Sequence, residues 1–306
     1  MIKPAQRITV EQAKAALLRS GYLIEGRIES LLVRNGYYVE ANDAYRDPST
    51  DKSREIDLFA ITARQISRRR MDFVFNVLLI ECVNNPQPLV LLTKPALTSF
   101  LFHEDVRVSG LPVKVLASKP KRWVPIQEAI NLQRFHHYCT RRVATQFCSF
   151  SRKSDQDWFA QHEGSHFDSF QKLCDCLDYF QAEHYATWTF SADEPINIQF
   201  YYPILILQGE LLEARATRKD VTLTPARHLQ YRRPVVREGR GFTYQIDVVT
   251  EAAFPRLLRL LDIELDTIMR RIKANTAIFD TSIRQIVSRA RRLRSPEAIR
   301  RALEQL

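Results

Sequence analysis

The stretch "VLLIECVNN", residues 77–85, decides the fold because it joins the chain's most hydrophobic strand pattern to a carboxylate. Its apolar run predicts a buried β-strand that covers residues 72–83. Glu81 lies near the end of that strand. A buried charge is costly unless a metal ion, an arginine or a proton pairs with it. Glu81 is therefore expected to have a partner, and each of the three partners implies a different protein.

A second acid lies in the preceding stretch "REIDLFAIT", residues 54–62, where apolar and polar residues alternate. This alternation predicts a strand with two different faces and places Asp57 near its middle. If the two strands pair in antiparallel fashion, Asp57 and Glu81 lie side by side. Two bare carboxylates at that distance repel each other, so one binds a proton unless a cation lies between them. Such an oxygen-rich pair suits Mg²⁺ or Mn²⁺, which can polarise a phosphate and activate a water molecule.

Hydrophobic periodicity predicts the surrounding elements. Apolar residues recur every three or four positions over residues 10–35, which predicts a helix broken at Gly21. Further strands are expected at 88–94, 111–119, 198–216 and 242–250, and a helix is expected from Phe254 onward. The middle of the chain, about 125–190, is rich in histidine and aromatic residues, and we expect it to be a helical insertion. The sequence thus predicts an α/β protein with a mixed β-sheet flanked by helices.

This order of a helix and two acid-bearing strands resembles the PD-(D/E)XK nuclease superfamily, which has the restriction-endonuclease-like fold. The resemblance lies in "YLIEGRIESLLVRNGYYVEANDAYRDPSTDKSREIDLFA", residues 22–60, followed by "NVLLIECVNN", residues 76–85. It covers roughly residues 20–94, under a third of the chain. It implies a restriction-endonuclease-like core, and we expect that domain to occupy residues 1–265.

The resemblance also implies roles for single residues. Asp57 and Glu81 would be the metal ligands, with the carbonyl of Cys82 as a backbone ligand of Mg²⁺ or Mn²⁺. Glu25 matches the family's helix glutamate and would orient a water molecule, with Glu29 one turn further on as its competitor. The implied activity is metal-dependent hydrolysis of phosphodiester bonds in DNA or RNA, in bacterial antiviral defence or DNA processing.

One position departs from the family pattern. Val83 stands where the family has a lysine, so the ammonium that orients the water and stabilises developing charge is missing there. In one alternative a lysine or arginine from elsewhere reaches the site, and Lys94, Lys52 and Arg54 are nearby in sequence. In the other, the protein is a catalytically inactive nuclease-fold protein that serves as a nucleic-acid-binding or assembly subunit.

Charge favours a polyanionic partner. The net charge is +10, which promotes association with nucleic acid, and DNA is the expected partner before RNA. The segment 266–306 is expected to be a basic helical tail whose arginines contact phosphates: Arg284, Arg289, Arg291, Arg292 and Arg294. The alternative is an amphipathic helix that packs on the core or on a second subunit, in a homo-oligomer or a larger complex.

Cysteine and histidine usage gives weaker signals. The chain has five cysteines, and an odd number without a secretory segment favours a reducing, cytoplasmic location. No apolar run is long enough for a membrane span, so no membrane association is expected. The histidines and cysteines of the middle segment lack the spacing of a zinc finger, and residue type without spacing is weak evidence for zinc.

Overall fold

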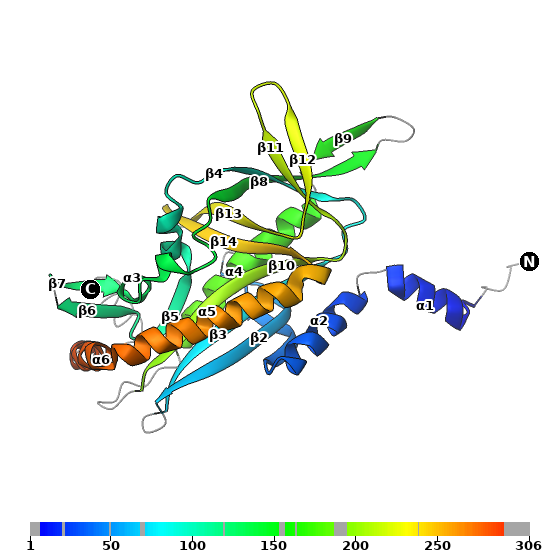
Figure 1. Cartoon of the computed structure of the whole chain (residues 1–306). Helices are drawn as coiled ribbons and strands as arrows, with labels where there is room; N and C mark the ends of the chain where they lie inside the picture. The colour runs from blue at the N-terminus through cyan, green and yellow to red at the C-terminus, as the bar shows by residue number, and fades with distance from the viewer. Residues whose placement is uncertain are drawn as a thin grey trace, which may run out of the picture.

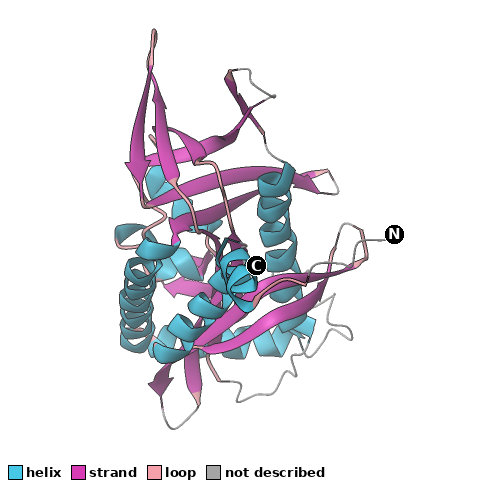
Figure 2. Ribbon diagram, turned by 90° about the vertical axis from the view of Figure 1, so that its right-hand side faces the viewer, coloured by secondary structure: helices cyan, strands magenta, loops and turns pink. Residues whose placement is uncertain are grey.

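The computed structural model describes residues 7–19, 22–48, 50–67, 71–118, 120–152, 157–162, 164–186, 195–237 and 239–290. These residues form an α/β structure around one large mixed sheet of twelve strands. Ten strands follow each other in the order β1-β2-β3-β10-β14-β13-β8-β4-β11-β12, while β5 pairs with β10 and β9 with β8. Figure 2 shows the strong twist of this sheet and the helices that cover it.

The helices are α1 (Val10–Arg19), α2 (Tyr22–Arg34), α3 (Ile126–Ala129), α4 (Gly164–Ala186), α5 (Phe254–Ala274) and α6 (Thr276–Ala290), with 3₁₀ turns η1 (Ser99–Asp105), η2 (Leu132–Arg134) and η3 (Glu251–Ala253). The first seven strands are β1 (Tyr38–Arg46), β2 (Ser53–Ser67), β3 (Asp72–Val83), β4 (Leu89–Pro95), β5 (Arg107–Leu111), β6 (Lys114–Ser118) and β7 (Lys121–Pro125). The others are β8 (Arg142–Arg152), β9 (Trp158–Gln161), β10 (Asn197–Leu207), β11 (Leu211–Ala216), β12 (Val221–Ala226), β13 (His228–Arg237) and β14 (Arg240–Thr250). β6 and β7 form a separate two-stranded sheet.

Helices cover both faces of the large sheet, and each face has its own core. α2 and α5 pack on one face, where Ile28 and Leu261 lie in the same apolar cluster as Ile80, and α6 extends this cluster over β6. α4 packs on the opposite face, and its Leu173 lies in a second cluster with Leu79. Figure 1 shows α5 crossing one side of the sheet and α4 behind it. Burying each such aliphatic side chain contributes about 1.5–3 kcal/mol, so β3, apolar on both faces, anchors both cores.

The predicted pairing of the two acid-bearing strands is confirmed. β2 and β3 are adjacent and antiparallel, with Leu58 opposite Ile80 and Phe59 opposite Leu79. β3 continues in parallel with β10, and β10 with β14. The register places Val83, Leu207 and Thr250 in one row at the carboxyl edge of these three strands. The end of the opening stretch is explained as well: Asn85 binds the turn between β10 and β11 by accepting a hydrogen bond from the Gly209 N–H at 2.8 Å.

The expected helical middle is wrong over residues 142–152 and 158–161. β8 and β9 lie there, and β8 belongs to the central sheet, between β13 and β4. The segment "RVATQFCSF" is rich in β-branched and aromatic residues, and it contributes to both cores, with Val143 in one apolar cluster and Phe147 in the other. The helical expectation holds for α4.

The carboxyl-terminal helices join the core. α5 runs without a break across residue 265, where the domain boundary was expected. The apolar stripe of α6 is buried at Ile283, Ile286 and Val287, so the packing alternative holds for this part of the tail. Arg284 is exposed on α6, and Arg289 lies in the same helix, while three further predicted contact residues fall outside the described residues: Arg291, Arg292 and Arg294. None of the described helices combines the length and the apolar character that crossing a bilayer requires.

Candidate active site

The β2–β3 pair opens into a fork at its acidic end. The backbone ladder reaches Leu58 opposite Ile80, and extending this register by one residue places Asp57 opposite Glu81. Beyond that point a side chain replaces the backbone acceptor of the ladder: the Cys82 N–H donates to Oδ2 of Asp57 at 2.7 Å. This bond fixes the Asp57 carboxylate in the mouth of the fork and leaves Oδ1 for another partner. The sequence prediction that Asp57 and Glu81 meet is therefore confirmed.

The Cys82 carbonyl faces the same fork. The Val83 carbonyl accepts a hydrogen bond from the Gln208 N–H at 2.9 Å, on the β10 side of the strand. Because backbone groups alternate in direction along a strand, the N–H and carbonyl of Cys82 point to the β2 side. The N–H is the group that binds Asp57. The fork thus presents two carboxylates and one backbone carbonyl, which are hard oxygen donors of the kind that Mg²⁺ and Mn²⁺ prefer.

A lysine reaches the fork from a distant helix. Lys172 of α4 places its Nζ 2.6 Å from Oε1 of Glu81 and 3.8 Å from Oδ1 of Asp57. The side chain of Glu81 is only 5% exposed, so this ion pair is largely shielded from solvent. α4 is held against the sheet by its buried apolar residues: Phe170, Leu173, Cys174, Cys176 and Leu177. The Tyr45 hydroxyl also donates to the Lys172 carbonyl at 3.3 Å and ties β1 to this turn of α4.

Sequence reasoning missed Lys172. The basic residues that lie near the motif in sequence are placed elsewhere: Arg54 pairs with Asp47 at 2.6 Å, and Lys52 and Lys94 are exposed. The signal that pointed to Lys172 was weak. It is a lysine at the margin of the apolar stripe of α4, a position where a long side chain packs its stem on the core.

Glu25 approaches the fork from α2, which packs on the other face of the sheet through Ile24 and Ile28. Burial raises the pKa of Glu25, the negative charge of Asp57 raises it further, and Lys172 opposes both. Glu25 is therefore within electrostatic reach of both Asp57 and Lys172. The fork receives a carboxylate from α2 on one face and an ammonium from α4 on the other.

The cluster holds a proton near neutral pH. Burial, followed by the charge of Asp57, raises the pKa of Glu81 to about 8, although Lys172 acts to lower it. Burial also raises the pKa of Asp57, against the effect of the Cys82 N–H and Lys172. Burial lowers the pKa of Lys172, but Glu81 and Asp57 outweigh this and raise it, so the ammonium stays charged. Two carboxyl groups beside one ammonium carry an excess negative charge, and the proton that they share removes it.

A second buried polar cluster lies between α5 and the sheet. His136, His137 and Glu264 place a possible ligand atom each within 4.8 Å of the others. His137 binds two acids: its Nδ1 lies 2.8 Å from Oε2 of Glu264, and its Nε2 lies 3.1 Å from Oδ2 of Asp247. Asp247 is fully buried and also accepts a hydrogen bond from Nε2 of His228 at 2.7 Å. Sequence spacing gave no indication of this group, because Glu264 lies far along the chain.

The hydrogen bonds of this second cluster favour protons over a metal ion. Burial would lower the pKa of His137, but the charges of Asp247 and Glu264 and the bonds to them raise it to about 10. His137 is thus an imidazolium that donates from both nitrogens. In His136, Nδ1 accepts the Tyr138 N–H at 3.1 Å, which leaves the proton of the neutral ring on Nε2, the atom that faces Glu264. A metal ion at Nε2 would have to displace that proton.

Comparison with known proteins found no match, either among protein-family models, among curated proteins or among solved structures. The chemistry of the fork and of the second cluster is therefore inferred from their own residues.

Replacing His137 by alanine should destabilise the protein by about 3–5 kcal/mol, because Asp247 and Glu264 would remain buried without their cation. The folded-state pKa of about 10 lies above the ordinary value of 6.5. The stabilisation is therefore complete below about pH 6.5 and disappears as the pH rises toward 10. Urea unfolding at pH 6.5, 8 and 10 in EDTA would measure the difference between wild type and variant, which should shrink along this series. The exposed His162→Ala is the control, and a difference that is constant with pH would contradict the imidazolium assignment.

Proposed function

We propose that the protein is a metal-dependent nuclease with a restriction-endonuclease-like core, which hydrolyses phosphodiester bonds of nucleic acid, DNA before RNA. The observation that carries this proposal is the contact of Lys172 with Glu81 and Asp57 at the β2–β3 fork. The lysine that the motif lacks at Val83 is supplied from α4. An ammonium, the buried carboxylate of Glu81, the partly buried carboxylate of Asp57 and a helix glutamate then converge on one point, a set that can serve phosphodiester hydrolysis.

The residues of the fork fit a hard divalent ion. Asp57, Glu81 and the Cys82 carbonyl would hold Mg²⁺ or Mn²⁺, since all three offer oxygen atoms at the mouth of the fork. When bound, such an ion supplies charge that polarises the phosphate and stabilises the leaving oxygen. Every carboxylate that holds the ion must be ionised, so the proton retained by the cluster is released first.

The remaining two residues have complementary roles. The Lys172 ammonium stabilises the negative charge that develops on the phosphate oxygens. Glu25 orients a water molecule and accepts its proton, a role that its raised pKa favours. Each role depends on an element that packs on the sheet independently, α4 for the lysine and α2 for the glutamate.

The alternative is a catalytically inactive nuclease-fold protein that binds nucleic acid or serves as an assembly subunit. Val83 at the lysine position is the observation that favours it. The position of Lys172 weakens that argument, since an ammonium from α4 stands beside the carboxylates without one on β3. The net charge of +10 is compatible with both functions.

Replacing Lys172 by methionine should lower the rate of Mn²⁺-dependent cleavage by about 10²–10³-fold, the effect of removing one donor that stabilises developing charge. Cleavage of a labelled duplex in single-turnover experiments measures this effect. Lys94→Met, an exposed lysine on β4, is the matched control and should retain full activity. Thermal melts would show that both variants are folded.

Placing a lysine on β3, at the position where the family pattern has one, tests whether the lost activity is due to the missing ammonium. Val83 follows Glu81 by two residues and so points to the same face of β3. Adding Val83→Lys to Lys172→Met should restore part of the lost activity, while Val83→Lys alone should add little to wild type. Full activity in Lys172→Met would contradict the role of this lysine, whatever the double variant does.

Metal binding should release close to one proton per ion at pH 7, because Glu81, with a pKa near 8, must ionise to become a ligand. Isothermal titration of Mn²⁺ in buffers with different ionisation enthalpies measures the number released. It should fall toward zero by pH 9.5, while the affinity rises with pH up to about 8. Glu81→Gln should bind the ion weakly and release no proton. Binding to wild type without proton release at pH 7 would contradict the protonated cluster.

A further inference from the structure

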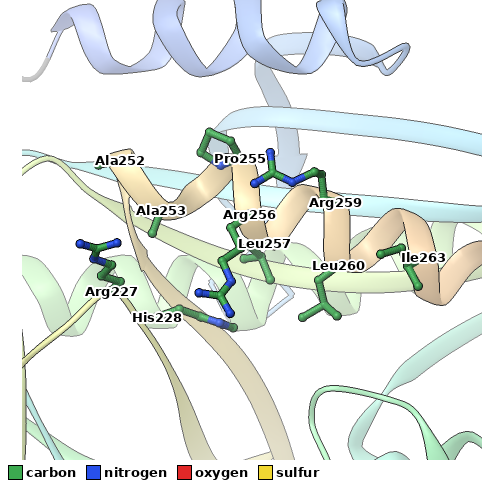
Figure 3. A pocket seen from close by; sticks show the side chains of 10 residues that line it. All are labelled: Arg227, His228, Ala252, Ala253, Pro255, Arg256, Leu257, Arg259, Leu260 and Ile263. Atoms are coloured by element: carbon green, nitrogen blue, oxygen red, sulfur yellow. The ribbon is translucent and has the colours of Figure 1, made fainter.

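A basic pocket lies on the α5 face of the sheet, outside the fork. It has a volume of about 890 Å³ and is lined by residues from the start of β13, from η3 and from the first turns of α5. Figure 3 shows Arg227 and His228 on one side and Arg256 and Arg259 on α5. Its floor is apolar and includes Leu257 and Leu260.

The charge of this pocket is unbalanced. No acidic residue lines it, and Arg227, Arg256 and Arg259 are all exposed. Within the described part of the chain, none of these three guanidinium groups forms an ion pair. Three like charges around one hollow repel each other, and an anion between them removes that repulsion. Guanidinium groups suit phosphate oxygens in particular, because they donate two parallel hydrogen bonds.

A buried acid holds the fourth polar residue of the pocket in position. His228 donates from Nε2 to Asp247 at 2.7 Å, so its ring is fixed by a carboxylate that is 0% exposed. This bond places the ring proton on Nε2. The other nitrogen, Nδ1, has no bond to any described residue and is available to a ligand in the pocket. The second buried cluster thus forms the support beneath the pocket.

The pocket and the fork share one edge of the sheet. Val83 at the end of β3 and Thr250 at the end of β14 are separated by one strand, which corresponds to roughly 10 Å. The wall of the pocket begins two residues after Thr250, at Ala252. The intervening Glu251 pairs with Arg27 of α2 at 2.5 Å, two residues after Glu25. α2 therefore connects the water-orienting glutamate to the pocket wall.

We infer that this pocket binds backbone phosphates of the nucleic-acid strand on one side of the bond that is cut. This inference rests on the proposed nuclease function. A strand advances about 3.4 Å per nucleotide along the duplex axis, so the roughly 10 Å between the ends of β3 and β14 corresponds to about three nucleotides. The arginines contact phosphate oxygens, and the apolar floor receives the sugars. Contacts of this kind position the strand without reading its sequence.

Single substitutions on α5 test this inference. Arg256→Gln and Arg259→Gln should each weaken binding of a labelled twelve-nucleotide duplex by about three- to tenfold, through the loss of a charge-assisted bond. Each should also lower the slope of log affinity against log salt by about 0.9. Arg270→Gln removes the same charge from an exposed position on the same helix and is the matched control. Fluorescence anisotropy in EDTA measures binding without cleavage.

Each outcome decides between the alternatives. Equal effects of all three substitutions, or no binding of the duplex to wild type, would overturn the inference. A nucleoside monophosphate that binds as tightly as the duplex, with the same arginine dependence, would make this a small-ligand site and overturn it as well. Loss of binding in Arg256→Gln and Arg259→Gln without any Mn²⁺-dependent cleavage by wild type would support the pocket and reject the nuclease. Cleavage with an unchanged KM in both variants would do the reverse.

Discussion

The ion pair between Lys172 and Glu81, with Asp57 beside it, is the interaction on which the proposed site depends. Two acids at the mouth of a buried fork cannot both be ionised without positive charge close by. Lys172 supplies one charge and so leaves one acid uncompensated. Burial and the charge of Asp57 raise the pKa of Glu81 to about 8, so a proton occupies that place, and a divalent ion would displace it. The same interaction couples α4 on one face of the sheet to the strand ends between the two cores.

The two buried polar clusters differ in how their charges balance. His137 lies between Asp247 and Glu264 and donates to both, and Asp247 receives a further hydrogen bond from His228. Nearly every donor there has an acceptor, which is the arrangement that makes a buried network rigid. The fork, in contrast, combines two acids, one ammonium and a backbone carbonyl, and it retains an excess of oxygen ligands. This imbalance supports the proposal that the fork binds a cation, whereas the balanced network of His137 stabilises the fold.

Sequence periodicity was sufficient to predict the β2–β3 pair at the centre of the fold. It was insufficient to predict the contacts that depend on how distant elements pack. The alternation around Asp57 and the apolar run before Glu81 predicted two adjacent strands, because local pattern and burial agree there. Lys172 could not be predicted in the same way, since its contact with Glu81 depends on how α4 packs on the sheet. The helix predicted over β8 is wrong because the apolar residues of this strand contribute to both cores, Val143 to one and Phe147 to the other, so they show no clean alternation. The arginines of the pocket could not be predicted from sequence either, because they lie close together only where the start of α5 packs beside the start of β13.

A crystal structure with Mn²⁺, read by anomalous scattering, tests the central claim most directly. We predict one strong peak in the β2–β3 fork, about 2.0–2.2 Å from Oδ1 of Asp57, from a Glu81 oxygen and from the Cys82 carbonyl. The Lys172 ammonium should then lie further from Glu81, because the ion takes its place. A peak between His136, His137 and Glu264 together with an empty fork would contradict it. So would a fork in which Lys172 keeps its contact with Glu81 at saturating Mn²⁺.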